Sequence, residues 1–211
     1  MLNLRATFAT LLAVFWAGTG HAHPHIFVDT SLRLIVDETG TARQIEVTWQ
    51  YDAFYSLLIF EDLGLDQDGD GRLDDTELTR LNGFDLNWTE GFEGDVYATA
   101  AGNPVTLGAP EPGDTRVENG LITTVHTRSL SVPADGLVIK AYDPNFYTAY
   151  TLLPDLSASG GCRAQLITAD LDKAYTLLEE LLYAMPAGQA ENEYPAVGEA
   201  FADTMSVSCG A

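Results

Sequence analysis

The chain has 211 residues, and 31 Asp and Glu residues against 10 Lys and Arg residues give it a formal net charge of −21. This acidity argues against nucleic-acid binding, because phosphates demand a basic surface. The length suits one domain or two small ones, and a hydrophobic content of 46% is enough for a real core.

The N-terminal residues 1–22 are typical of a signal peptide. Arg5 precedes the short apolar run Phe8–Ala17, and the small residues that follow end at Ala22, where we expect cleavage. The run is shorter than the roughly 20 residues that a membrane span requires, although an uncleaved anchor is the alternative. We therefore expect residues 23–211 to form a single exported domain, located in the periplasm, without a transmembrane segment.

Two strands are predicted next. Ile26–Asp37 is rich in β-forming residues, and from Ile45 to Tyr51 apolar and polar residues alternate strictly. Glu38-Thr39-Gly40 between them has the composition of a turn, so the two strands are expected to form a hairpin.

Residues 66–77 match a complete twelve-residue EF-hand calcium loop. Gly71 stands at the sixth position, where the chain must turn sharply around the ion, and Arg72 needs to offer only its backbone carbonyl. The predicted calcium ligands are Asp66, Asp68, Asp70, Arg72, Asp74 and Glu77. The alternative is an acidic, solvated turn, since Asp-Gly runs also occur in ordinary loops.

The segments on either side of the loop predict helices, and together they indicate a helix–loop–helix insertion at about residues 53–82. Ala53–Leu65 can form the entering helix, with Phe54, Leu57, Leu58 and Leu65 near helical spacing, and a leaving helix can begin at Glu77. No second loop of this kind is present in the sequence. A lone site is expected to bind weakly, at ~0.1–1 mM, which suits a structural calcium outside the cytoplasm.

The rest of the chain predicts further strands and a C-terminal helical part. The expected strands are Asp95–Ala101, Val105–Leu107, Leu121–Val132, Leu137–Tyr142 and Tyr147–Leu152, separated by turns rich in Gly, Pro and Asn. Leu171–Met185 is an amphipathic helix with Asp170 as its N-cap, and Pro195–Val207 suggests a further helix and a short strand. The predicted class is α+β, a mostly antiparallel sheet or sandwich with the helical insertion and a C-terminal helix.

Both cysteines, Cys162 and Cys209, lie in the predicted exported part. In such a protein a pair indicates a disulfide bond, which would pin the C-terminal tail to the body. Thiol metal ligation or a redox pair is the alternative.

Histidines form a second candidate metal site. Cleavage after Ala22 would leave His23 as the N-terminal residue, whose α-amine and imidazole can chelate one ion, and His25 lies two residues on. With His126 as a tentative third ligand, this set suits zinc, nickel or copper. A frayed N-terminus with incidental histidines, and a hydrogen-bonded His126 on a strand, are the alternatives.

The segment Tyr142–Tyr147 is also unusual. Asp143-Pro144 initiates a turn, and the aromatic residues around it either wall a pocket or pack as part of an ordinary core turn.

These features together resemble domain-of-unknown-function family 1007, an exported bacterial family. The resemblance rests on His23-Pro24-His25-Ile26-Phe27-Val28-Asp29 after the signal peptide, the Asp-x-Asp-x-Asp-Gly loop, the 142–147 segment, Phe201-Ala202-Asp203 and Val207-Ser208-Cys209. It covers most of the predicted exported chain and implies a periplasmic component near metal transport, often beside nickel/cobalt-type membrane exporters or permeases. His23, His25, Asp143 and the acids of the calcium loop are the matched positions.

Three functions follow as hypotheses. The first is a periplasmic metal-binding accessory protein with structural calcium and a transition metal, zinc or nickel/cobalt, at the His-Pro-His start, serving a membrane transporter. The second is a calcium-dependent binding module without a transition-metal role. The third, an enzyme such as a copper oxidase with an N-terminal histidine brace, is not expected, because no nucleophile motif or His-Glu-x-x-His motif is present.

Overall fold

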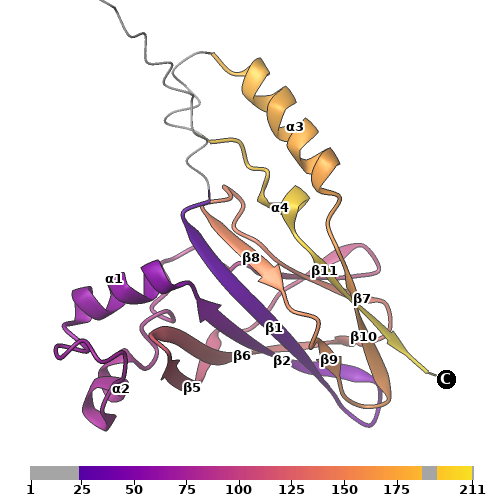
Figure 1. Ribbon diagram of the computed structural model, residues 1–211. Coiled ribbons are helices and arrows are strands. Elements are labelled where there is room, and N and C mark those ends of the chain that lie inside the picture. The colour runs from indigo at the N-terminus through magenta and orange to yellow at the C-terminus, as the bar shows by residue number, and fades with distance from the viewer. Residues whose placement is uncertain (1–23, 187–193, 211) are drawn as a thin grey trace, which may run out of the picture.

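The computed structural model describes residues 24–186 and 194–210. The predicted signal peptide, its cleavage site and His23 lie outside these residues. Eleven strands and four helices form within the described part, arranged as two β-sheets with the helices around them (Figure 1). This arrangement confirms the α+β class.

The predicted N-terminal hairpin is confirmed. Strand β1 (Ile26–Val36) pairs antiparallel with β2 (Thr41–Tyr51), from Val28 opposite Tyr51 to Val36 opposite Ala42. The alternation seen in the sequence corresponds to burial, because every second residue faces the core from Val28 to Val36 of β1 and from Ile45 to Tyr51 of β2.

The first sheet has the order β5-β6-β2-β1-β8, with β9 also pairing with β1. Its remaining strands are β5 (Pro110–Glu118), β6 (Leu121–Pro133), β8 (Thr148–Leu152) and β9 (Ser157–Ala158). The sheet is mostly antiparallel, as expected, and the exception is one edge, where β8 and β9 run parallel to β1. The reason is that β7, which precedes β8, belongs to the other sheet, so the chain crosses over instead of making a hairpin with β1.

The second sheet is antiparallel throughout and has the order β10-β11-β7-β3-β4. Its strands are β3 (Val96–Ala100), β4 (Asn103–Val105), β7 (Leu137–Ala141), β10 (Cys162–Ile167) and β11 (Thr204–Cys209). Strand β11, the last in chain order, therefore lies inside the sheet between β10 and β7.

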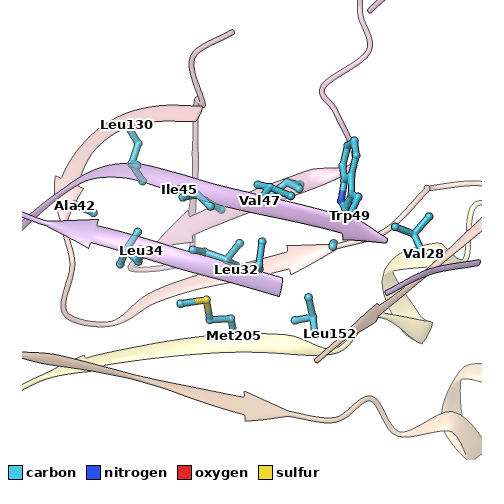
Figure 2. Packing of buried hydrophobic residues seen from close by; sticks show 14 of the residues in the cluster. Val28, Leu32, Leu34, Ala42, Ile45, Val47, Trp49, Leu130, Leu152 and Met205 are labelled. Atoms are coloured by element: carbon cyan, nitrogen blue, oxygen red, sulfur yellow. The ribbon is translucent and has the colours of Figure 1, made fainter. Parts of the chain in front are cut away.

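The core lies between the two sheets. Leu32 and Leu34 of β1 and Ile45 and Val47 of β2 are fully buried, and Met205 of β11 lies against them from the second sheet (Figure 2). Burial of each such side chain contributes about 1.5–3 kcal/mol. One hydrophobic cluster includes residues of both sheets and of the helical insertion.

The helices occupy two separate regions. Helices α1 (Ala53–Leu63) and α2 (Asp75–Leu81) lie beside β5 and β6, whereas α3 (Leu171–Ala184) and α4 (Gly198–Phe201) contact each other at the far end of the molecule (Figure 1). The predicted C-terminal helix is confirmed as α3, with the Asp170 carboxylate accepting a hydrogen bond from the Lys173 backbone N–H.

Cys162 and Cys209 form a disulfide bond, as predicted, and their strands β10 and β11 pair at that position. Disulfides persist in oxidising compartments, which agrees with an exported protein. No helix within the described ranges combines the length and apolar character that a membrane crossing requires.

Candidate metal centre and the histidine positions

The helix–loop–helix segment begins at Asp52. Its carboxylate accepts a hydrogen bond from the Tyr55 backbone N–H and caps α1. Helix α1 ends at Leu63, two residues earlier than predicted, because Gly64 takes a left-handed conformation as its C-cap. Helix α2 begins two residues before the predicted Glu77, because Asp74 acts as its N-cap.

Three carboxylates meet in the loop between these helices. One oxygen each of Asp66, Asp68 and Asp70 lies within 4.8 Å of the others. Two oxygens on opposite sides of a calcium ion lie up to about 5 Å apart, since each binds at 2.3–2.6 Å. The spacing of this group therefore fits one hard cation, and the loop borders a hollow of 440 Å³.

Hydrogen bonds within the loop hold these acids in place. Backbone N–H groups of Asp70 and Gly71 donate to the Asp66 carboxylate at 3.0 and 3.1 Å. Glu77 links the two ends of the loop, because its carboxylate accepts from the N–H of Asp66 at 2.9 Å and from that of Asp74 at 3.0 Å. Carboxylates this close repel one another, and a bound cation would remove that repulsion.

The backbone conformation agrees with the reading of Gly71. Its φ of +74° lies in the left-handed region that favours glycine, and this is where the sequence predicts the sharp turn. Asp66 also has a positive φ, of +47°. Aspartate tolerates that region better than most residues do.

Asp74 has a role that the sequence reading did not assign. Its carboxylate accepts hydrogen bonds at 2.8 Å from the N–H groups of Thr76 and Glu77, and it forms a capping box with Glu77. The Asp-x-x-Glu spacing was the available signal for this cap. Calcium ligation by Asp74 and by the Arg72 carbonyl stays a prediction.

The segment is fastened to the first sheet. The Ser56 hydroxyl accepts a buried hydrogen bond from the Ile122 N–H at the start of β6. The Thr115 hydroxyl of β5 donates to the Asn82 side chain just after α2, and Arg80 donates to the Leu63 carbonyl across the two helices. The loop is thus built on the β5–β6 hairpin.

His25 stands at the entrance to β1. Its backbone N–H donates to the Tyr147 carbonyl at 2.8 Å, and its exposed ring lies 4.7 Å from the Tyr147 ring, centroid to centroid. These contacts place the imidazole at the surface.

His126 is fully buried on the inner face of β6. Its ring packs against Trp49 and Trp88, with centroids 4.6 and 6.0 Å apart, and neither ring nitrogen has a hydrogen-bond partner among the described residues. Burial lowers the pKa of His126 to about 4, and the neighbouring Arg128 charge contributes.

The structure does not bring His126 and His25 together. His126 of β6 pairs with Val47 of β2, and Val47 in turn pairs with Leu32 of β1. His25 lies seven residues before Leu32, which corresponds to roughly 20 Å along an extended strand. The His126 side chain is a core residue in this arrangement, and His25 lies at the end of the sheet.

The 142–147 segment forms a turn around Asp143. The Asp143 carboxylate accepts hydrogen bonds from the backbone N–H groups of Asn145, Tyr147 and Thr148 at 2.9–3.1 Å. Phe146 stacks on Phe201 with centroids 4.3 Å apart, while Tyr142 stacks on Tyr97. The turn therefore both packs aromatic residues and supplies Asp143 to a neighbouring pocket.

A family model described as "protein of unknown function (DUF1007)" matches residues 8–209 of the chain. The chain belongs to this family. Membership in DUF1007 confirms the resemblance found in the sequence, and the match spans both sheets, the helix–loop–helix segment and both cysteines. Comparison with curated proteins finds no match. The family description names no activity, so any function for this DUF1007 member must be argued from its own residues.

Proposed function

We propose that this DUF1007 protein is an exported, periplasmic metal-binding accessory protein. It binds calcium structurally at the EF-hand-like loop Asp66–Glu77. It binds a transition metal, zinc or nickel/cobalt, at the His-Pro-His start for delivery to a membrane transporter. The observation that carries the calcium part is the convergence of three carboxylates within 4.8 Å in a loop capped by helices on both sides.

A structural role for calcium is supported by the anchoring of the loop. Ser56 and Thr115 tie the two flanking helices to β6 and β5. A calcium ion there would stabilise the joint between the helical segment and the first sheet. Opening of the segment as a calcium switch would break these hydrogen bonds, so the fixed arrangement favours a structural ion.

The transition-metal part is supported by the exposed ring of His25 and by its firm attachment through the Tyr147 carbonyl. His23, the other predicted ligand, lies outside the described residues. An α-amine and two imidazoles are nitrogen donors, which suit zinc, nickel or cobalt better than calcium.

Calorimetric titration of metal-free protein with calcium tests the first part. Glu77→Gln keeps an acceptor for the Asp66 N–H but removes the charge and the bidentate carboxylate, so we expect at least about tenfold weaker binding, or about 1.4 kcal/mol. Glu179→Gln on the exposed face of α3 is the matched control and should bind as the wild type does. Equal affinity in wild type and Glu77→Gln would reject the site.

Titration with Zn²⁺ and Ni²⁺ tests the second part, using protein whose N-terminus is shown by mass spectrometry to be His23. Both His25→Ala and a variant with one additional glycine before His23 should lose affinity, the latter because the chelating amine is displaced. Unchanged affinity in both variants would leave no transition-metal role for this end of the chain.

A calcium-dependent binding module is the second candidate, and one observation favours it. Phe54, Leu57 and Leu58 of α1, which leads into the calcium loop, have side chains that are 67%, 52% and 38% exposed. Ser56 and Phe60 make the buried face instead. This candidate predicts calcium-dependent partner binding that is lost on Leu57→Ser and is insensitive to His25→Ala.

A further inference from the structure

A second pocket lies where the two sheets meet, away from the calcium loop. It has a volume of 630 Å³ and is bordered by the segment before β3, the turn around Asp143, and β8. Phe92 and Tyr97 supply aromatic surface to the pocket, and Asp143 and Tyr150 also line it. We call it the Asp95 pocket, after the acidic residue that is most deeply placed in it.

Asp95 is a buried acid that has no cationic partner among the described residues. The residue is only 7% exposed, and its Oδ2 accepts a hydrogen bond from the Tyr150 hydroxyl at 2.9 Å. None of the described residues that line the pocket is Lys or Arg. The nearby Arg128 guanidinium is committed elsewhere, donating to the carbonyl oxygens of Gly108 and Glu93 at 2.6 Å.

A buried carboxylate of this kind is costly when ionised, unless a cation compensates its charge. Burial accordingly raises the pKa of Asp95 to about 7; the Asp143 charge adds to this, while the Tyr150 hydrogen bond opposes it. Near neutral pH the carboxylate is therefore poised to ionise when a positive ligand arrives.

The shape of the pocket distinguishes an organic cation from a metal ion. A volume of 630 Å³ lies in the range of small-molecule sites and far exceeds the space of a bare ion. The three carboxylates with metal-ligand spacing that the described residues contain are in the calcium loop, not here. Asp143 is already engaged by three backbone N–H groups.

The aromatic walls suit the same ligand class. The Tyr97 ring stacks on Tyr142 with centroids 4.2 Å apart and an angle of 23° between the planes, so its position is fixed. An ammonium or guanidinium group gains further attraction from aromatic faces, and an apolar body gains from their burial.

We propose that the Asp95 pocket binds a small organic cation, an ammonium or guanidinium group on an apolar body, with its charge paired to the Asp95 carboxylate. This site goes beyond the proposed metal-binding function and does not depend on it. Asp95 is the charge-pairing residue, Tyr150 orients its carboxylate, and Phe92 and Tyr97 hold the body of the ligand.

Calorimetric or NMR titration with phenethylammonium tests the proposal, with 2-phenylethanol as the uncharged probe and phenylacetate as the anion. The titrations contain saturating calcium. A lack of phenethylammonium binding then reports on the Asp95 pocket and not on an empty calcium loop. Wild type should bind phenethylammonium at least about tenfold more tightly than either comparison probe. Equal binding of the three would overturn the proposal.

Asp95→Asn is the sharpest variant, because Asn accepts the Tyr150 hydrogen bond and tolerates the positive φ of +50° at this position. It should bind phenethylammonium at least about tenfold more weakly. Asp29→Asn, on the exposed outer face of β1, should not change the affinity. Tyr97→Leu should weaken binding about threefold. Full affinity in Asp95→Asn, with an unchanged circular dichroism spectrum, would overturn the assignment.

The pH dependence gives an independent readout. The titratable groups around Asp95 are Tyr150, Asp143, Tyr97, Tyr142 and Glu93. Wild-type affinity for phenethylammonium should rise from pH 6 to pH 8 as Asp95 ionises, and that rise should be absent in Asp95→Asn. Asp95-dependent binding of Mn²⁺ or Ca²⁺ with no binding of phenethylammonium would instead make the pocket a metal site and refute the proposal.

Discussion

The Tyr150 hydroxyl donates a hydrogen bond to the Asp95 carboxylate across the boundary between the two sheets. Tyr150 belongs to β8 at the edge of the first sheet, and Asp95 immediately precedes β3 of the second. Both side chains are buried or nearly so. One carboxyl group thus links the two sheets.

Asp95 should make the protein less stable as the pH rises. Its pKa in the folded protein is about 7, above its ordinary value of 3.8, so the folded state keeps a proton that the unfolded state releases. The stability from this group is full below pH 4 and is lost as the pH rises towards 7. Asp95→Asn should remove this loss, which is on the order of a few kcal/mol.

Urea unfolding of wild type and Asp95→Asn from pH 4 to pH 8 measures this effect as a difference between the two proteins. The unfolding free energy of Asp95→Asn relative to wild type should increase with pH. A constant difference across that range would show that Asp95 does not bind a proton more tightly in the folded state.

His126 should act in the opposite direction. Because burial lowers its pKa to about 4 from 6.5, the unfolded chain takes up a proton between these values and the folded protein does not. Stability from the neutral ring is therefore lost as the pH falls from 6.5 to 4.

His126→Leu should remove that acid sensitivity and also gain about 1–3 kcal/mol, because it replaces two buried nitrogens that have no hydrogen-bond partner in the described part of the chain by apolar surface. Thermal unfolding at pH 5 and pH 7 checks both effects. His25→Leu, at an exposed position, is the control. A lower stability of His126→Leu at both values would indicate that the imidazole has a partner essential to the fold.

Loss of the disulfide should be costly. Cys162 and Cys209 are 47 residues apart, and closing a loop of that length stabilises by about 4 kcal/mol in the chain-entropy model. The double variant Cys162→Ala/Cys209→Ala should lose about that much unfolding free energy in urea. Adding a reductant should destabilise the wild type similarly and leave the double variant unaffected.

Gly71→Ala should destabilise the calcium loop. With φ at +74°, an alanine there costs about 1–2 kcal/mol, which should appear as weaker calcium binding by calorimetry. Gly210→Ala is the control, because Gly210 has no left-handed backbone and its surroundings are open. Equal calcium affinity in Gly71→Ala and wild type would mean that this turn relaxes without affecting the ligands.

The clearest elements could be predicted because local pattern and final environment agree. The alternation from Ile45 to Tyr51 becomes a half-buried strand, and Asp170 caps α3 as its spacing indicates. Strand β5 was missed because Pro110, Pro112 and Gly113 are typical of a turn. Prolines are tolerated here because β5 is an edge strand with a bulge after Pro112.

The two candidate sites also differ in how far the sequence alone reveals them. The calcium loop is a local motif of twelve residues, so its spacing is visible in the sequence. The Asp95 pocket joins residues 91–97 to residues 143–150, which lie far apart in the sequence. Nothing around Asp95 in the sequence distinguishes it from other aspartates. The burial of His126 between Trp49 and Trp88 likewise depends on tertiary packing alone.

The interior position of β11 has a consequence for the order of folding. As the chain emerges from its N-terminal end, β3, β4, β7 and β10 appear first, but β10 has no partner in its sheet until residues 204–209 arrive between it and β7. The second sheet can therefore close only after residues 204–209 have been synthesised. Such late, non-local pairing is slow.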